Sequence, residues 1–171
     1  PAGIQTMKFV SETAGFNFDS VTFTKVSDEC GAAVELPGTV EAEDYDTCGE
    51  GVSYHDTSSG NNGGVYRDDD VDIEASTPSG YNVGWIESGE WLEYTVNVTT
   101  AGTYCIGVRY ASLSSGGNYH IEFNGINVTG NTSVGATGGW QSWTTNYQTG
   151  VCLPAGVQKM RIVFDSAGVN I

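Results

Sequence analysis

Residues 81–98 read YNVGWIESGEWLEYTVNV, and this stretch decides the fold class. Within it, NVGWIES and EWLEYTVNV alternate apolar and polar side chains on either side of a Gly-containing turn, as half-buried β-strands do. Similar segments, separated by Gly-rich turns, recur as TVEAEDY (39–45), GTYCIGVRYAS (102–112), NYHIEFNG (118–125), WQSWTTNYQTG (140–150) and VQKMRIVFD (157–165). No window of about 12 residues keeps a helical period. The sequence therefore predicts an all-β antiparallel sandwich.

The amino-acid composition and net charge limit the classes of binding partner. The 171 residues suffice for one domain with a substantial core, and charged side chains make up only 16% of them. The formal net charge is -15, from 21 acidic and 6 basic side chains. Nucleic acids and anionic membranes require a basic contact surface, so both are excluded as expected partners. A neutral glycan or a divalent cation fits this charge.

The four cysteines, Cys30, Cys48, Cys105 and Cys152, show no CxxC or Cys/His spacing that would indicate zinc. Two disulfides in an exported protein are the simpler interpretation, the alternative being a reduced intracellular protein with four thiols. The strand map favours the pairs Cys30–Cys48 and Cys105–Cys152. No run approaches the ~20 apolar residues of a membrane span, and residue 1 opens no signal peptide, so we expect a secreted protein of which this chain is a piece.

Residues 1–18 (PAGIQTMKFVSETAGFNF) repeat as residues 154–171 (PAGVQKMRIVFDSAGVNI), with Pro, Ala, Gly, Gln, Met, Val, Ala, Gly and Asn identical at matching positions. A repeat at both ends predicts a chain cut from a tandem array of modules. Residues 1–26 are then the C-terminal portion of an upstream copy, residues 27–36 a linker, and residues 37–171 the main module.

After residue 18 the first copy continues as DSVTFTKV, an alternating pattern that predicts a strand at residues 19–26. The main module stops before the equivalent strand, and an orphaned strand edge is prone to pair with another chain. We therefore predict that residues 19–26 fill that slot, in the same chain or in a neighbour as a strand-swapped dimer.

Several motifs, in this order, resemble the family 6 carbohydrate-binding modules: EAEDY (41–45), YNVGWIESGEWLEYTVNV (81–98), AGTY (101–104), GGWQSW (138–143), LPAGVQKMRIVF (153–164) and AGVNI (167–171). The resemblance covers essentially all of residues 37–171. It implies a jelly-roll β-sandwich, a structural calcium ion, and two possible sugar sites, one in the loops at one end of the sandwich and one on the concave face of a sheet.

Aromatic rings bind pyranose by covering its C–H face, so exposed aromatics beside amides or carboxylates are the candidate sugar ligands. The resemblance makes Trp140 of GGWQSW the loop-site platform and assigns Trp143 to the core. It gives Tyr81 the role of second wall and Asn170 that of a hydrogen-bonding amide, for which Asn17 is the counterpart in the upstream copy. The alternatives are a core tryptophan, a turn tyrosine and a turn asparagine.

Two further tryptophans lie on predicted strands. Trp91 of SGEWLEY is assigned to the core. A concave-face sugar site around Trp85 stays open, because alternation does not separate such a site from packing.

Glu41 and Glu43 lie two residues apart on a predicted strand, so both point to one face and could chelate one ion, and hard oxygen ligands suit calcium. The resemblance implies a third ligand from the final strand, present in this chain only as Asp19. The alternative is a pair of solvated carboxylates.

The run RDDDVDIE (67–74) raises a catalytic alternative, because Asp70, Asp72 and Glu74 would share one strand face and resemble the active-site strand of family 16 glycoside hydrolases. Retaining hydrolases place a nucleophile and an acid/base about 5.5 Å apart. We favour an acidic loop instead, which binds a second cation or contacts sugar hydroxyls at the rim, with Asp68 as the candidate sugar ligand. The loop comprises Asp68, Asp69, Asp70 and Asp72.

The function predicted from sequence is therefore a non-catalytic polysaccharide-binding module that targets an attached glycoside hydrolase to β-1,3-glucan or an agarose-type glycan. A small family 16-like hydrolase using Asp70 and Glu74 is one alternative. A structural or adhesive spacer is the other.

Overall fold

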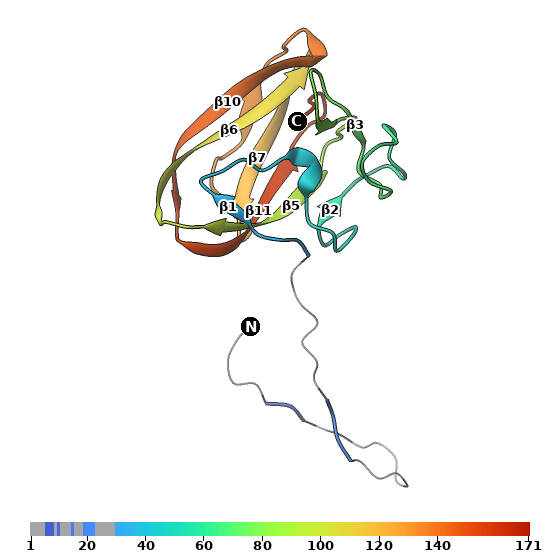
Figure 1. Cartoon of the computed structure of the whole chain (residues 1–171), viewed down its shortest axis with the longest axis vertical. Helices are drawn as coiled ribbons and strands as arrows, with labels where there is room; N and C mark the ends of the chain where they lie inside the picture. Colours follow the sequence, from blue (N-terminus) through green and yellow to red (C-terminus); the bar gives the residue numbers. More distant parts are fainter. Residues whose placement is uncertain (1–5, 9, 11–14, 16–18, 23–29) are drawn as a thin grey trace.

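The computed structural model describes residues 6–8, 10, 15, 19–22 and 30–171 (Figure 1). Its elements are β1 (Val34–Leu36), the short 3₁₀ helix η1 (Ala42–Asp44), β2 (Tyr54–His55), β3 (Ile73–Ala75), β4 (Tyr81–Val83), β5 (Trp91–Val98), β6 (Gly102–Ser112), β7 (Gly117–Phe123), β8 (Ile126–Asn127), β9 (Thr132–Val134), β10 (Gly139–Leu153) and β11 (Gly156–Phe164). In the described part of the chain, no helix is long and apolar enough to cross a membrane.

These strands form two layers. The larger sheet has seven strands, with β5, β11 and β7 antiparallel at its centre and β1 parallel to β5 at one side. The second layer is the long antiparallel pair of β10 and β6, and β3 and β4 form a separate hairpin (Figure 1). The all-β, jelly-roll sandwich predicted from the sequence is confirmed.

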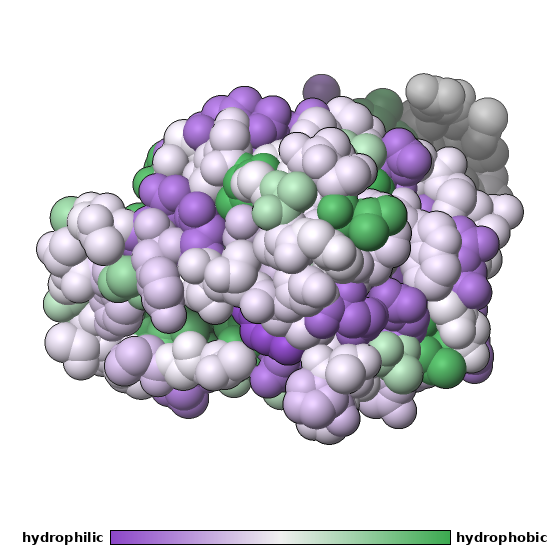
Figure 2. Space-filling model, turned by 90° about the horizontal axis from the view of Figure 1, so that it is seen from above, coloured by the Kyte–Doolittle hydropathy of each residue, from purple (hydrophilic) through white to green (hydrophobic). Residues whose placement is uncertain are grey.

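Strand alternation builds the core between the layers. In β5, Leu92, Tyr94, Val96 and Val98 are buried, and they pack with buried apolar residues of β7 and β11. Seen from above, the surface is mostly weakly polar, and strongly apolar residues form only small separate patches (Figure 2). Most large aliphatic side chains are accordingly inside.

Two tryptophans predicted for the core lie outside it. Trp91 alternates with inward-facing Leu92, so its ring lies on the outer face of the large sheet, 3.8 Å below the Arg161 guanidinium. Trp143 is half-buried under Arg109, whose guanidinium carbon lies 4.2 Å from the ring centroid. The β10–β6 register shifts between Gly139 and Thr144, and simple alternation from Trp140 misses that irregularity.

One of the two predicted disulfides is present. Cys30 and Cys48 are bonded, with their Cα atoms 5.0 Å apart. The predicted Cys105–Cys152 bond is wrong, because both thiols are free and exposed. Cys105 pairs with Thr149 and Cys152 with Thr103, so the two cysteines are diagonal neighbours. Diagonal positions lie about 7–8 Å apart, which exceeds disulfide reach.

Three segments near the N-terminus differ from the expected structure or are only partly described. Residues 34–36, expected in the linker, form β1 beside Val96–Val98. Residues 42–44, expected in a strand, form η1, whose Asp44 amide donates to the Glu41 carbonyl at 3.1 Å. Within the predicted donor strand, residues 19–22 are exposed and belong to no strand, and residues 23–26 lie outside the described residues. Strand exchange with a second copy stays a prediction.

Candidate functional site

Two exposed tryptophans share one hollow. The hollow has a volume of about 440 Å³, and Trp85, Trp140, Glu74 and Asn170 are among its lining residues. Trp85 is 51% exposed and Trp140 is 43% exposed, so both rings are accessible to a ligand. They come from the β4–β5 connection and from the start of β10, which are far apart in the sequence.

Trp140 is held by a loop anchored on Ser112. The amides of Thr137 and Gly138 both donate to the Ser112 carbonyl, at 2.8 and 3.0 Å. Gly138 adopts φ +89°, a conformation that favours glycine, and this turn leads directly into β10. The GG that precedes Trp140 in the sequence thus forms the turn that presents the indole at the end of the sandwich.

Trp85 sits in a strained backbone conformation. Its φ of +49° is unusual for a bulky non-glycine residue. The connection after it is held by the buried Glu90, whose carboxylate accepts hydrogen bonds from the Glu87 amide at 2.9 Å and from the Thr57 amide at 3.0 Å. Such strain persists only where surrounding structure enforces it, and it concentrates at functional sites. Here it places an exposed indole in the same hollow as Trp140.

The polar floor of the hollow centres on Asn170. Its Nδ2 donates to Glu74 Oε1 at 3.0 Å and to the Trp140 carbonyl at 3.2 Å. Both partners only accept, so the orientation of the amide is set and Oδ1 is left to accept from a ligand. The Asn170 backbone is also fixed, because it exchanges two hydrogen bonds with Ala111, at 2.9 and 2.8 Å.

Glu74 and Gln141 complete this floor. Gln141 Nε2 donates to Glu74 Oε1 at 2.9 Å and to Asn82 Oδ1 at 3.0 Å. Every hydrogen bond given to Glu74 within the described residues reaches Oε1, so Oε2 can accept a further donor from the hollow. A hydrogen-bonded network of this kind holds its members in one geometry before a ligand arrives.

The structure brings together only part of the predicted sugar set. Trp140 and Asn170 line one hollow, whereas Tyr81 does not line it and stacks against Tyr66 with ring centroids 4.7 Å apart. Asp68 is exposed and also lies outside that lining. Asn17 lies outside the described residues.

The residues that sequence reasoning missed are Trp85 as a wall of the loop hollow and Glu74 as a binding group. Trp85 was considered only for a concave-face site, because strand alternation gives no sign of its left-handed φ. An exposed Trp directly after a glycine, at the start of a turn, is the signal that was available.

The carboxylates of the acidic run RDDDVDIE (67–74) accept hydrogen bonds that hold nearby loops. Asp69 accepts from the Tyr45 hydroxyl at 2.6 Å, and Asp70 accepts from the Gly60 amide at 2.8 Å. Asp72 is buried and accepts from Asn62 through its amide at 2.6 Å and its side chain at 2.9 Å. Asp70 and Asp72 precede β3, so the shared strand face on which the hydrolase alternative relied does not exist.

The predicted calcium ligands are only partly brought together. Glu43 is buried within η1, and desolvation raises the pKa of its carboxyl group, with Glu41 and Asp44 adding to the increase. Glu41 precedes η1 and is exposed, because residues two apart in a 3₁₀ turn do not share a face. Among the described residues, no group of three or more His, Cys, Asp or Glu forms a metal site, and Asp19 is exposed. A buried carboxylate beside two others suits a cation, but the third ligand is not in place.

A β-sandwich that presents two exposed indoles around a hollow with a fixed amide floor has the features of a carbohydrate-binding module. Residues 41–171 match the family model "Carbohydrate binding module (family 6)". The chain belongs to this family.

Two similar proteins are much longer than this chain. The chain is 31% identical over 77% of its length to the clotting factor G alpha subunit of Tachypleus tridentatus, covering 18% of that protein. It is 37% identical over 39% of its length to the β-agarase AgaA of Microbulbifer thermotolerans, covering 16% of that enzyme. The chain thus spans less than a fifth of the length of these relatives.

Solved structures of single modules match more fully. The C-terminal family 6 module of LamC, a marine laminarinase from Zobellia galactanivorans, is 34% identical with a TM-score of 0.61, over 77% of this chain and 91% of that one. A β-1,3-glucan-binding family 6 module from Bacillus halodurans is 26% identical with a TM-score of 0.59, over 81% of this chain and 94% of that one.

Proposed function

We propose that the hollow between Trp85 and Trp140 binds a neutral polysaccharide of the β-1,3-glucan or agarose type, and that the chain holds an attached glycoside hydrolase on that substrate. The observation that carries the proposal is the pair of half-exposed indoles facing a hollow whose floor is a fixed amide and carboxylate. One similar module is described as β-1,3-glucan-binding, and two other relatives are a laminarinase module and a β-agarase.

Each part of the hollow contributes a different interaction. The indoles cover the C–H faces of sugar rings and exclude water from them. Asn170 Oδ1 and Glu74 Oε2 accept hydrogen bonds from sugar hydroxyls, since their partner atoms are already bonded within the protein. The net charge of -15 disfavours sulfated or uronic glycans, because like charges would be brought together.

Affinity electrophoresis through gels loaded with laminarin, lichenan, agarose or xylan tests this function. Retardation by laminarin or agarose is expected for the intact chain, and Trp140→Ala or Trp85→Ala should weaken it at least about tenfold. Trp91→Ala is the matched control, because that indole lies under Arg161 and does not line the hollow. Unchanged retardation of both hollow variants would refute the proposed site.

We further propose that Glu41 and Glu43 hold a structural calcium ion. Support comes from the burial of the Glu43 carboxylate and its raised pKa, which a cation would offset by favouring the charged form. Calcium at about 100 times its dissociation constant stabilises a fold by about 2.7 kcal/mol. Melting temperatures in calcium and in EDTA should therefore differ for the intact chain but not for Glu43→Gln, and equal values for the intact chain would exclude the ion.

We infer that the protein works outside the cell. Support comes from the Cys30–Cys48 disulfide, since such bonds persist in oxidising compartments.

A further inference from the structure

The charged groups that face the tryptophan hollow are all acidic. Among the described residues, the only ionisable side chains in its lining are Glu74 and Glu87, which accompany Trp85 and Trp140. Glu74 belongs to β3, and Glu87 lies in the β4–β5 connection, two residues after Trp85. A ligand that enters the hollow therefore meets two aromatic rings and two carboxylates.

Neither carboxylate is neutralised by a basic side chain. Glu74 accepts through Oε1 from the side-chain amides of Asn82 at 3.3 Å, Gln141 at 2.9 Å and Asn170 at 3.0 Å, and such bonds leave its negative charge in place. Glu87 is exposed. All ion pairs within the described part of the chain involve other carboxylates. Both charges that face the hollow are thus uncompensated.

A third carboxylate lies behind the β4–β5 connection. The buried Glu90 accepts from the Glu87 amide at 2.9 Å and from the Thr57 amide at 3.0 Å. Its charge acts on the neighbouring Asp56: burial raises the pKa of Asp56 to about 6, and the charges of Glu90 and Asp72 add to this increase. Negative potential therefore accumulates on this side of the hollow.

The basic side chains of the sandwich lie elsewhere. Lys159 and Arg161 form ion pairs on the outer face of the large sheet. Arg67 and Arg109 each stack over an aromatic ring that does not line the hollow. Because no basic group of the described residues lines the hollow, a cation carried by the ligand would be the first to pair with its carboxylates.

A protonated amine on a sugar matches each of these groups. An ammonium has three N–H donors and no acceptor, whereas a carboxylate only accepts, so the two groups pair without a competing atom. Hydrogen bonds between charged partners are about twice as strong as neutral ones. The face of an indole also attracts a cation. An amino sugar keeps the stacking available to a neutral sugar and adds these charge interactions.

A free metal ion fits the hollow less well. Calcium takes about six to eight oxygen ligands, but only two carboxylates line the hollow, and Glu74 Oε1 already accepts three hydrogen bonds. No group of three or more His, Cys, Asp or Glu among the described residues forms a metal site. The positive charge is therefore better supplied by a ligand that the two indoles can also hold.

We propose that the Trp85–Trp140 hollow binds a sugar unit that carries a protonated amine in preference to its neutral counterpart, and that Glu87 sets this preference. Glu74 Oε2 provides a second carboxylate oxygen for the amine. Glu74 also orients the Asn170 amide, whereas the Glu87 side chain has no partner among the described residues and so serves only the charge of the ligand. The inference rests on the proposed function, because it uses the same hollow and the same indoles.

Isothermal titration calorimetry with matched hexasaccharides tests this preference. At about pH 6 the carboxyl groups are ionised and sugar amines are protonated. The β-1,4-linked glucosamine hexamer should bind at least about tenfold more tightly than cellohexaose, which has a hydroxyl in place of each amine. The ratio of the two affinities should shrink at about 0.5 M salt, because salt screens the charges.

Glu87→Gln should reduce this ratio from about tenfold to about threefold, because it removes one of the two facing charges and keeps the size of the side chain. Glu35→Gln is the matched control, since it removes the same charge from an exposed residue of β1 that does not line the hollow. The ratio should be unchanged in that variant. Trp85→Ala should weaken binding of the glucosamine hexamer at least about tenfold, which places the ligand in the hollow.

Two results would overturn the preference. One is a glucosamine hexamer that binds no more tightly than cellohexaose, or not at all. The other is an equal fall of the ratio in Glu87→Gln and Glu35→Gln, which would indicate attraction to the net charge of the whole protein. In either case, retardation of the intact chain by laminarin or agarose leaves the proposed function standing, whereas a chain that binds neither hexamer and is retarded by no glycan contradicts both.

Discussion

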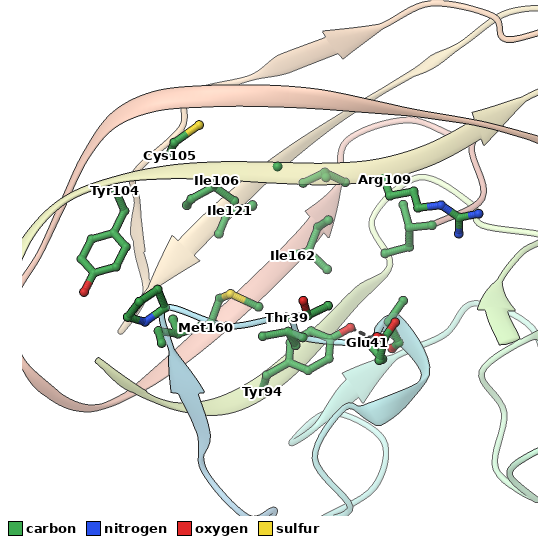
Figure 3. Close-up of a pocket in the computed structure, with 18 of the residues that line it drawn as sticks. Thr39, Glu41, Tyr94, Tyr104, Cys105, Ile106, Arg109, Ile121, Met160 and Ile162 are labelled. Carbon is green, nitrogen blue, oxygen red and sulfur yellow. Dashed lines mark hydrogen bonds between the residues drawn. The ribbon is translucent and has the colours of Figure 1, made fainter. Parts of the chain in front are cut away.

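Two consecutive residues of the chain, Asn170 and Ile171, line two different hollows. Asn170 lines the hollow with Trp85 and Trp140, and Ile171 lines a second hollow of about 340 Å³, between β6 and residues 36–43, which we call the β6 groove (Figure 3). Successive residues of an extended chain point to opposite sides, so one short segment contributes an amide to one hollow and an aliphatic side chain to the other. The amide suits a sugar ligand on one side, and the aliphatic group packs against the apolar core on the other.

The two hollows also differ in the polarity of their linings and in how far their polar groups are already hydrogen-bonded within the protein. The side-chain amides on the floor of the tryptophan hollow are hydrogen-bonded within the protein, so that site is formed before a ligand binds. The β6 groove has a mainly apolar lining, in which Ile106, Ile121 and Ile162 meet. A preformed polar floor gains affinity from few new contacts, whereas an apolar lining stabilises the fold by burial.

Replacement of Ile171 should show the largest contrast between the two hollows. Ile171→Asp places a charge among the apolar residues that Ile171 packs against, and we expect the free energy of unfolding to fall by about 2 kcal/mol because an unpaired charge is expensive to bury. Polysaccharide retention of the folded protein should stay unchanged. Ile171→Val is the control that should keep the stability, and loss of sugar binding in folded Ile171→Asp would show that the two hollows are not independent.

Removal of the Asn170 side-chain amide should weaken glycan binding and leave the packing around Ile171 unchanged. Asn170→Ala takes away the Oδ1 acceptor and a partner of Glu74 Oε1, so affinity for laminarin or agarose should fall about tenfold by isothermal titration calorimetry. The sedimentation behaviour should be that of the intact chain. A variant that binds sugar normally would remove Asn170 from the ligand set.

A smaller effect on the sugar hollow is expected from Gly84→Ala. A Cβ at this position would lie 3.3 Å from Asn170 Oδ1, so the amide must shift by a few tenths of an ångström. Affinity for the glycan should fall about threefold with little change in melting temperature. Gly89→Ala is a useful control for backbone strain, since Gly89 has φ +95° and nothing near its added Cβ.

The pH dependence of stability should give the smallest signal. Burial raises the pKa of Glu43, so the folded state binds more protons than the unfolded state, and stability falls as pH rises above about 4.5. Glu43 lines the β6 groove, so Glu43→Gln should flatten this part of the pH profile by less than about 1 kcal/mol without changing sugar affinity. Chemical denaturation in EDTA between pH 4 and pH 7 checks this; a profile that keeps its slope would contradict it.

The fold class was predictable because alternation and turns are local. The seven-stranded sheet and the β10–β6 pair follow segments whose pattern is visible in the sequence. The error at residues 39–45 arose because a single 3₁₀ turn is too short to leave a pattern of its own in a segment that otherwise alternates. The Tyr94 hydroxyl, which donates to the Ala42 carbonyl at 2.8 Å, ties that turn to β5.

Only part of the candidate site could be predicted from the sequence. Trp140 was found because a GG turn before an aromatic residue presents that residue at a strand end. Trp85 was not assigned to the loop hollow, because its orientation depends on a φ of +49° that is held by contacts from distant segments, including Glu90 to Thr57. Tyr81 looked equivalent in the sequence, but it packs on Tyr66 instead.

The sequence by itself determined the β-sandwich, the family resemblance, the Cys30–Cys48 pair and the repeat between residues 1–18 and 154–171. These features depend on the spacing of apolar residues, on composition and on local sequence motifs. The tertiary structure alone decided which indoles share a hollow, that Cys105 and Cys152 stay apart, and that Trp91 lies under Arg161 on the outer face of the large sheet. The physical reason is that each of these depends on register and backbone torsion set by contacts between segments far apart in the chain.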